Sequence, residues 1–78
     1  MHYTYLLKLN DDEYYSGSTS DIKSRIKAHQ NGQNLSTKNK RPVKLVWCCA
    51  FKTKKLAENF EQYLKSSSGF AFRNKHLI

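Results

Sequence analysis

Five side chains in this sequence have the types needed to hydrolyse a phosphodiester bond. Two are phenols, Tyr5 and Tyr15, and two stand four residues apart as a guanidinium and an imidazole, Arg25 and His29. The fifth is a lone carboxylate far downstream, Glu61. The reaction needs a base that activates water, positive charge for the developing negative oxygens, and stabilisation of the leaving oxygen. The hypothesis is therefore that the fold gathers these five groups around a single divalent metal.

Each of the five also has an ordinary structural explanation. Tyr5 and Tyr15 could be half-buried strand aromatics, and Arg25 could be a surface charge. A histidine on an apolar face is more often a satisfied structural residue, and Glu61 could simply pair with Lys65 one helical turn away. Only their conjunction, in order, on elements that meet in space, indicates a site.

The small number of carboxylates favours one metal ion over two. Two-metal nucleases need several clustered carboxylates, whereas this chain has 6 acidic residues. Three of them, Asp11, Asp12 and Glu13, share one expected turn, and Asp21 is expected to cap a helix. One Mg²⁺ or Mn²⁺ ion on Glu61 would take phosphate oxygens and waters as its other ligands, as magnesium prefers. A tyrosine is a poor base at its usual pKa of about 10, but positive charge beside it favours the phenolate.

Composition points to a small nucleic-acid-binding protein. The 78 residues are expected to form one domain, residues 1–78, with a small core. The 14 lysines and arginines outnumber the 6 acidic residues, and the net charge of +8 favours anionic partners, nucleic acid first. Aromatic residues, at 13% of the chain, offer stacking surfaces among the basic groups. No signal-peptide pattern and no span long enough for a bilayer is present, so no membrane association is expected.

Two strands joined by a turn are expected at the start of the chain. Residues 3–9 alternate large apolar side chains, Tyr5 among them, with more polar ones, which is a strand pattern. Residues 10–12 are turn-forming, and residues 13–16 are expected to return as the second strand. Gly17 then marks a close approach of the backbone to another group, or a turn that a side chain would forbid.

A helix is expected next, at about residues 20–31. Ser18 and Asp21 have the spacing of a capping box. Asn31 and Gly32 end the helix, with the glycine in the left-handed conformation.

This helix is expected to present Arg25 and His29 beside its buried stripe. At about 100° per residue, its two isoleucines and His29 fall on one side, with Arg25 at the edge. Lys23 and Lys27 are turned elsewhere and are expected to bind nucleic acid. The polar segment 33–42 carries Lys38, Lys40 and Arg41 and is expected to grip phosphate groups.

Residues 43–51 are the most apolar run of the chain, apolar on both faces, and are therefore expected to form the central strand. Cys48 and Cys49 are adjacent in this run. Neighbouring strand side chains point to opposite faces, so a disulfide between them is not expected. Free thiols are typical of a reducing compartment, which predicts a cytoplasmic protein.

A second helix is expected from about residue 53 or 54 to about residue 65. Its buried stripe would consist of Leu56, Ala57, Phe60, Tyr63 and Leu64. Glu61 borders this stripe, where a metal ligand must lie, whereas Glu58 is nearly opposite and reads as a solvated charge. Residues 66–69 are expected to end the helix, and the tail 70–78 to dock on the body through its two aromatic residues.

The ordered series resembles the GIY-YIG nuclease superfamily, particularly its small stand-alone members. The resemblance runs from Tyr3-Thr4-Tyr5 through Tyr15-Ser16-Gly17 and Arg25, and covers nearly the whole chain to residue 75. Tyr3-Thr4 replaces the Gly-Ile of the first motif, and Ser16 replaces the Ile of the second. Since the chemistry and backbone geometry come from the tyrosines and Gly17, these departures are tolerable.

The resemblance implies an α+β fold with a three-stranded antiparallel sheet flanked by helices. The implied order is β-β-α-β-α with a short C-terminal helix or tail, and the implied active site lies on the exposed face of the sheet. By position, Tyr5 resembles the general base or water-orienting tyrosine, and Tyr15 the second tyrosine of the site. Arg25 resembles the phosphate-stabilising arginine, His29 the helix histidine, and Glu61 the glutamate that binds the metal.

The expected function is that of a metal-dependent DNA endonuclease, the kind of enzyme that serves DNA repair, with one Mg²⁺ or Mn²⁺ ion and a tyrosine base. One alternative is a basic nucleic-acid-binding module of the same fold without catalysis. A third class, a protein that binds acidic protein partners, predicts no DNA affinity at low salt. A stand-alone domain lacks appended DNA-binding modules, so weak sequence preference is expected, conferred by the 33–42 loop and by a protein partner.

Overall fold

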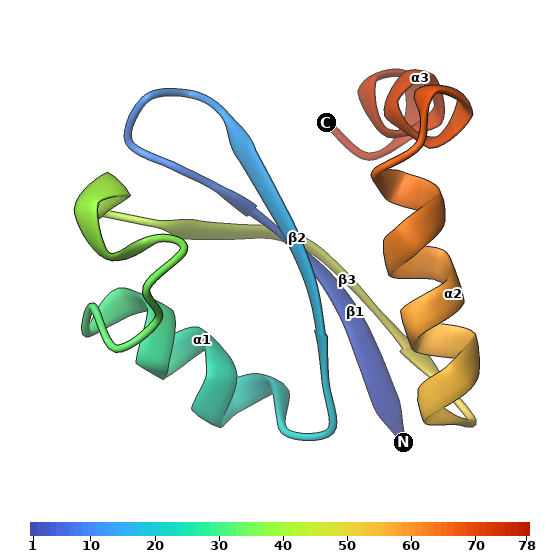
Figure 1. The fold of residues 1–78 in the computed structure, drawn as a ribbon, viewed down its shortest axis with the longest axis horizontal. Helices are drawn as coiled ribbons and strands as arrows, with labels where there is room; N and C mark the ends of the chain where they lie inside the picture. The colour runs from blue at the N-terminus through green and yellow to red at the C-terminus, as the bar shows by residue number, and fades with distance from the viewer.

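A computed structural model describes all residues, 1–78, as a three-stranded antiparallel sheet with helices on both faces (Figure 1). The elements are β1 (His2–Lys8), β2 (Tyr14–Thr19), α1 (Ile22–Gln30), the 3-10 turn η1 (Lys38–Lys40), β3 (Lys44–Phe51), α2 (Lys54–Leu64) and α3 (Ser67–His76). In Figure 1, α1 lies on one side of the strands and α2 and α3 on the other. The predicted α+β fold class is confirmed.

A tight turn joins β1 and β2 as expected. The amide of Glu13 donates to Asp11 Oδ1 over 3.1 Å, and the amide of Leu9 donates to the Glu13 carbonyl over 2.8 Å. Asp12 takes a positive φ of 66°, which a short Asx side chain tolerates. The second strand runs further than predicted, to Thr19, because its last residues continue to pair with β1 as far as Tyr3.

The prediction that residues 43–51 form the central strand is wrong. The strand order is β2-β1-β3, so β1 is central and β3 lies at an edge. Every side chain of β1 from Thr4 to Leu7 is fully buried. Both faces of β3 are apolar because both are covered: Leu45 faces α1, and Trp47 packs against Phe60 of α2. A strand that is apolar on both faces is covered by other elements on both sides. This pattern does not show whether the strand is central or lies at an edge of the sheet.

A β-bulge in β3 also changes the predicted alternation of its side chains. Leu6 pairs with Trp47 and the next residue, Leu7, pairs with Leu45, which leaves Val46 without an opposite residue. Leu45 therefore faces α1 with Leu7, whereas Trp47 faces α2 with Leu6. In a strand without a bulge, Leu45 and Trp47 would lie on the same face.

Helix α1 is capped three residues later than the capping box predicts. Ser18 belongs to β2, and Asp21 is itself the N-cap, accepting from the Ser24 amide over 3.1 Å. The commitment of Asp21 to a cap is thus confirmed, although Ser18 takes no part. Gly32 follows the helix with a φ of 77°, the left-handed conformation that was expected.

Helices α2 and α3 form a corner rather than a helix followed by a loose tail. Thr53 caps α2 through the Leu56 amide, and Ser66 caps α3 through the Gly69 amide. Gly69 lies so close to the Tyr63 carbonyl that any side chain there would overlap it. The serine-rich segment therefore does end α2, but it also begins α3. None of the helices has the length and hydropathy needed to cross a membrane.

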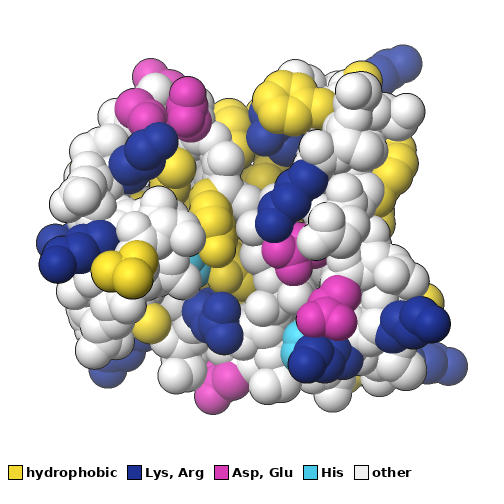
Figure 2. Space-filling model, viewed as in Figure 1, with side chains coloured by type: hydrophobic (Ala, Val, Ile, Leu, Met, Phe, Trp, Pro, Cys, Tyr) yellow, Lys and Arg dark blue, Asp and Glu magenta, His cyan; other side chains and the backbone are white.

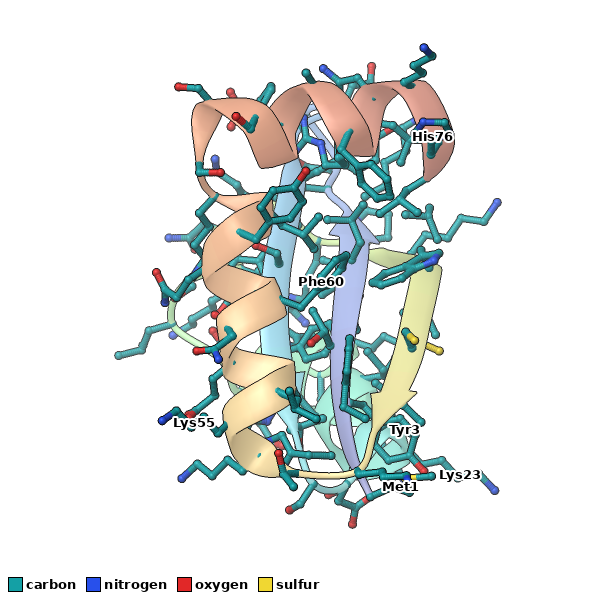
Figure 3. The ribbon with its side chains drawn as sticks, turned by 90° about the vertical axis from the view of Figure 1, so that its right-hand side faces the viewer. Met1, Tyr3, Lys23, Lys55, Phe60 and His76 are labelled. Carbon is teal, nitrogen blue, oxygen red and sulfur yellow. The ribbon has the colours of Figure 1, made fainter.

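Aromatic side chains fill the space between the sheet and these two helices. Phe60 lies at their centre and projects from α2 toward the strands (Figure 3). Its ring centroid is 5.6 Å from Trp47, 5.7 Å from Phe51 and 6.5 Å from Phe72. Docking of the tail through Phe72 is confirmed, whereas Leu56 of the predicted stripe is 49% exposed.

Candidate active site

The phenol of Tyr5 is the centre of the site. Tyr5 lies in the middle of the central strand, is fully buried, and its Oη is 2.9 Å from His29 Nε2. Gly17 pairs directly with Tyr5 across the β1–β2 ladder. A Cβ on residue 17 would overlap the Tyr5 phenol, so only glycine leaves room for it. The close approach predicted at Gly17 is thus confirmed, and the approaching group is the Tyr5 ring.

His29 connects Tyr5 to a residue that the sequence did not single out, Thr37. The other ring nitrogen of His29, Nδ1, is 2.7 Å from Thr37 Oγ1, and both residues are fully buried. A turn holds Thr37 in place, because the Lys40 amide donates to its carbonyl over 2.9 Å. No periodicity marks Thr37 as buried, since it stands in the polar segment between α1 and β3. Only the packing of that segment against α1 reveals it.

The three rings of Tyr5, Tyr15 and His29 pack together. The Tyr15 and His29 centroids are 5.2 Å apart, the Tyr5 and His29 centroids 5.7 Å, and the Tyr5 and Tyr15 centroids 6.5 Å. Tyr15 pairs across the ladder with Leu7, two residues after Tyr5 in β1, so both tyrosines lie on the sheet face that α1 covers. The expectation that the active site lies on an exposed face of the sheet is therefore wrong, because α1 and the segment after it cover both tyrosines.

Burial keeps His29 neutral. It lowers the pKa of the His29 imidazole, and the nearby Arg25 charge lowers this pKa further. Near pH 7 the ring therefore carries a single N–H. Arg25 itself is exposed at the surface of α1, on the Tyr5 side of the helix.

Burial also raises the pKa of Tyr5, to about 12. The Tyr15 phenol adds to this increase, the Arg25 guanidinium opposes it, and the Glu61 carboxylate makes a small further contribution. Because Tyr15, Arg25 and Glu61 all influence the pKa of the Tyr5 phenol, all three lie near it. The other four predicted site residues therefore all lie near the buried phenol of Tyr5.

Glu61 reaches this region from α2. Its side chain is 16% exposed, and Oε2 accepts from Lys65 Nζ over 2.8 Å. This is the i,i+4 ion pair that the sequence left open as a structural explanation. Glu58, by contrast, is exposed, as its helical phase predicted. The ion pair with half-exposed Lys65 is one that a divalent cation can displace, so it does not exclude metal binding by Glu61.

Glu61 is the one carboxylate available to a metal at this site. No three His, Cys, Asp or Glu side chains gather anywhere in the structure. A lone carboxylate suits a hard ion such as Mg²⁺, which usually keeps several waters and takes its other ligands from substrate phosphates. The donor set thus fits one such ion bound together with a substrate, and it does not fit a site that holds a metal by protein ligands alone.

The site opens along β2, the strand nearest the viewer in Figure 1. Figure 2 shows the same face in space-filling form, with hydrophobic side chains over β2 at the bottom of a hollow. A basic side chain borders the hollow on the α1 side, and an acidic and a basic one border it on the α2 side. The hollow runs between α1 and α2, along the outer edge of the sheet.

The predicted phosphate-binding residues do not all gather around the hollow. Lys23 and Lys27 line a different groove, between α1 and β3, together with Leu45 and exposed Cys48. Arg25 lies on the Tyr5 side of the same helix. Helical residues two positions apart point in nearly opposite directions. Because Arg25 points toward Tyr5, Lys23 and Lys27 on either side of it point away.

Lys40 is engaged by acidic residues of the β1–β2 turn. Its Nζ lies 3.2 Å from Asp11 and 3.3 Å from Glu13, and these hydrogen bonds and charges raise the pKa of Lys40. Lys38 and Arg41 remain exposed on the same segment, where Arg41 Nε donates to the Lys38 carbonyl. Of the three basic groups predicted to grip phosphate, Lys40 is thus tied to protein carboxylates.

The fold and the site define a small α+β domain with the groups for phosphodiester chemistry at one edge of its sheet. The model of the GIY-YIG catalytic domain matches residues 1–75. The chain therefore belongs to the GIY-YIG family of catalytic domains, which are generally endonuclease domains.

Relatives and a solved structure agree with this assignment. The chain is 42% identical over 66 residues to the UPF0213 protein CPE1444 of Clostridium perfringens, covering 83% of this chain and 71% of that protein. It is 43% identical over 68 residues to the UPF0213 protein SSP2268 of Staphylococcus saprophyticus, covering 86% and 83%. The solution NMR structure of the UPF0213 protein BH0048 from Bacillus halodurans superposes with a TM-score of 0.59 at 32% identity, covering 95% of this chain and 82% of that one.

Proposed function

We propose that this protein is a metal-dependent endonuclease that hydrolyses phosphodiester bonds in DNA with one metal ion and Tyr5 as the general base. The observation that carries the proposal is the buried Tyr5 phenol, hydrogen-bonded to His29 and within reach of the charges of Arg25 and Glu61. Membership of the GIY-YIG family and the basic charge of the chain support the same activity.

Tyr5 must lose its proton to act as a base, and its raised pKa opposes this in the free protein. Part of that increase comes from the negative charge of Glu61. A divalent cation on Glu61 would cancel this contribution, and its positive charge would favour the phenolate. When bound, the ion would also supply positive charge to the phosphate oxygens. Substrate and metal would thus together activate Tyr5, which stays protonated and inert without them.

His29 then serves as a hydrogen-bond donor to Tyr5. Thr37, neutral His29 and Tyr5 together have three polar hydrogens, two O–H and one N–H, but only two hydrogen bonds join them. Either Thr37 or Tyr5 must therefore point its O–H away from His29. Thr37 Oγ1 has no other partner and no exposure, so an outward O–H there would stay unpaired at a cost of about 1–3 kcal/mol. Tyr5 Oη is equally buried in the free protein, but it is the end that the proposal places against the substrate, where its O–H would find a phosphate or water oxygen as acceptor. Thr37 therefore donates to Nδ1, and His29 Nε2–H donates to Tyr5 Oη, where it would stabilise the phenolate.

Arg25 would bind the scissile phosphate. It is exposed at the mouth of the site, and it lowers the pKa of both Tyr5 and His29. A guanidinium presents paired donors that match phosphate oxygens. Tyr15 packs beside Tyr5 and His29 and would line the pocket for the attacking water.

The decisive experiment measures cleavage of labelled single-stranded, duplex and branched DNA with magnesium, manganese or chelator. We expect cleavage that requires the metal and that is abolished by Glu61→Gln and by Arg25→Ala while DNA binding persists. Glu58→Gln is the matched control, because it removes an exposed carboxylate one turn away on the same helix. No cleavage of any substrate, or full activity in Glu61→Gln, would refute the proposal.

The rate should rise with pH if Tyr5 is the base. Well below the pKa of the base, the reactive fraction grows about tenfold per pH unit. We therefore expect the single-turnover rate of the wild type to rise steeply from neutral to alkaline pH. A rate independent of pH over this range would exclude a tyrosine base.

One observation favours a second function, a DNA-binding module without catalysis. Tyr5 is fully buried with a pKa near 12, as expected of a structural phenol. In that case DNA binding would weaken steeply with salt, as phosphate contacts require, and no metal would produce cleavage. The free thiols Cys48 and Cys49 are compatible with a reducing compartment, and we place either function in the cytoplasm with a protein partner for specificity.

A further inference from the structure

Arg73 of α3 is the one lysine or arginine of the chain that is buried, at 8% exposure. It takes part in none of the four ion pairs of the structure, which belong to Lys8, Lys40 and Lys65. No carboxylate oxygen therefore lies within 4.0 Å of its guanidinium. A charged side chain is rarely buried without a partner of opposite charge. This position therefore calls for an anion or for another means of stabilisation.

Two aromatic rings and one amide hold the Arg73 guanidinium in a fixed orientation. Its Cζ is 3.9 Å from the Phe70 ring centroid and 5.0 Å from the Tyr14 ring centroid. Its Nε and Nη2 both donate to Asn74 Oδ1, over 3.2 and 3.1 Å. The remaining amino group, Nη1, makes no hydrogen bond within the protein. Nη1 is thus an oriented hydrogen-bond donor of the guanidinium that has no partner in the protein.

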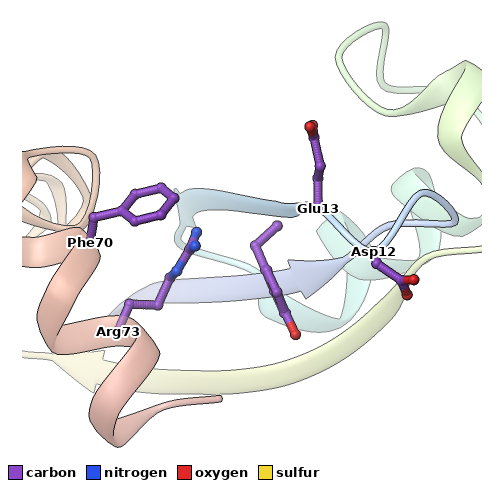
Figure 4. Close-up of a pocket in the computed structure, with 5 residues that line it drawn as sticks. Asp12, Glu13, Phe70 and Arg73 are labelled. Carbon is purple, nitrogen blue, oxygen red and sulfur yellow. The ribbon is translucent and has the colours of Figure 1, made fainter.

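Arg73 borders a pocket of about 430 Å³ between α3 and the β1–β2 turn, whose other lining residues are Asp12, Glu13, Tyr14 and Phe70. Figure 4 shows Arg73 and Phe70 extending into it from α3, while Asp12 and Glu13 point away from both. The two carboxylates are also compensated, Asp12 by Lys8 at 3.5 Å and Glu13 by Lys40 at 3.3 Å. Arg73 is the charge of the pocket that no ion pair balances.

We infer that this pocket is a nucleotide subsite, in which Arg73 binds a phosphate of the nucleic-acid strand and Phe70 offers its ring to a base. Tyr14, which lines the pocket, directly precedes Tyr15 of the active site in β2. Neighbouring strand residues point to opposite faces of a sheet, but β2 is an edge strand, so nucleic acid that follows its open edge would meet both places, one after the other. The subsite rests on the proposed function, because it holds a nucleotide that flanks the bond to be cut. An unstacked base suits a single-stranded or locally opened substrate, since paired bases keep their faces stacked.

Binding rather than cleavage tests this subsite, so its failure can be told from failure of the nuclease proposal. We would measure the affinity of the whole protein for labelled single-stranded DNA, with chelator present, over a range of salt concentrations. Arg73→Gln should weaken binding about tenfold and reduce the salt slope by about 0.7, the value for one phosphate contact on a single strand. Lys55→Gln is the control, since Lys55 lies at the end of α2 far from α3 (Figure 3) and should leave the subsite intact.

Phe70→Leu separates the base from the phosphate. It should weaken binding of ordinary DNA about fivefold, within the range of one stacking contact, and leave binding of an abasic strand unchanged. A folded Arg73→Gln protein with wild-type affinity and salt slope would overturn the inference. Equal loss on both strands in Phe70→Leu would show that the ring only supports α3, and would overturn the base contact.

Arg73 also holds α3 against the β1–β2 hairpin through the Tyr14 ring, so Arg73→Gln could unfold. In that case NMR of the wild-type Arg73 side-chain N–H groups replaces it, with titration of a single-stranded trinucleotide. A shift of the Arg73 resonances that follows saturation supports the subsite. Unchanged Arg73 resonances in the presence of bound trinucleotide would overturn it.

Discussion

The two faces of the sheet are built on opposite principles, although consecutive residues of one strand supply both. Tyr5 faces α1 and enters a chain of buried hydrogen bonds with His29 and Thr37. Leu6, the next residue, faces α2 and the aromatic cluster around Phe60. The α1 face requires particular donors and acceptors at particular distances, whereas the α2 face requires chiefly apolar volume.

This difference assigns separate tasks to the two faces. Every buried side-chain nitrogen and oxygen of the protein has a hydrogen-bond partner, and on the α1 face Tyr5, His29 and Thr37 are linked in one continuous chain of such bonds. Such a network loses its function when one member is changed, even by a group of the same shape. The aromatic cluster tolerates changes of shape as long as the volume is kept. Substitutions in the Tyr5–His29–Thr37 network should therefore alter chemistry, and those in the aromatic cluster around Phe60 should alter stability.

The largest expected effect is that of Tyr5→Phe on cleavage. The ring and its packing remain, but the group proposed as base is gone, and the rate should fall by about 10² to 10⁴-fold. Single-turnover cleavage with metal in excess measures this loss. A wild-type rate in Tyr5→Phe would show that another residue is the base and would contradict the proposed difference between the two faces.

The next largest effect is that of Phe60→Ala on stability. Removing the ring at the centre of the aromatic cluster should lower the free energy of unfolding by about 3 kcal/mol, which urea denaturation measures. The cleavage rate per folded molecule should not change, and Phe60→Leu should lose less stability because more volume remains. A fall in cleavage by the folded Phe60→Ala protein would contradict the separation of tasks.

Thr37→Val should act on both properties through the tautomer of His29. The methyl group keeps the volume but cannot donate to Nδ1, so the unfolding free energy should fall by about 1–3 kcal/mol. The ring is then free to place its proton on Nδ1, and cleavage should slow. NMR of the imidazole nitrogens should show the Nε2–H tautomer in the wild type and in Thr37→Ser, and a mixture in Thr37→Val. The same tautomer in all three proteins would remove Thr37 from the positioning of His29.

The smallest expected effect is a dependence of stability on pH that comes from His29. Its pKa is lowered by folding, whereas in the unfolded chain it is about 6.5. Below that value the unfolded state binds a proton that the folded state does not. The free energy of unfolding should therefore fall with decreasing pH, by at most about 1.4 kcal/mol per unit, until the pH reaches the lowered pKa. Urea denaturation at a series of pH values should show this slope in the wild type and a smaller one in His29→Asn.

Much of the fold and most of the site follow from local patterns. Alternation in residues 3–9 indicates β1, helical phase places Arg25 and His29 together, and the same phase separates Glu61 from Glu58. These inferences hold because each concerns the direction of side chains along one element, which its own period sets. Gly17 belongs here as well, since a glycine in a strand signals close approach even before the approaching group is known.

Other features could not be predicted because they depend on which elements meet. The apolar faces of residues 43–51 are consistent with a central strand and with a covered edge strand, and only the pairing of β1 on both its edges decides between them. The sequence indicates that Lys23 and Lys27 are exposed, but the orientation of α1 on the sheet decides that they point toward β3. Strand order and helix seating minimise the free energy of the whole chain, and no window of a few residues contains that information.

By itself the sequence determined the types and order of the groups that surround Tyr5, and the elements that carry them. Tertiary structure alone decided that Thr37, from a polar segment, is the buried partner of His29, and that Arg73, from the tail, is buried between two rings without a counter-charge. The physical reason is that burial and partnership belong to pairs of residues distant in sequence. Their contact exists only after sheet and helices have packed, whereas periodicity is already written along each segment.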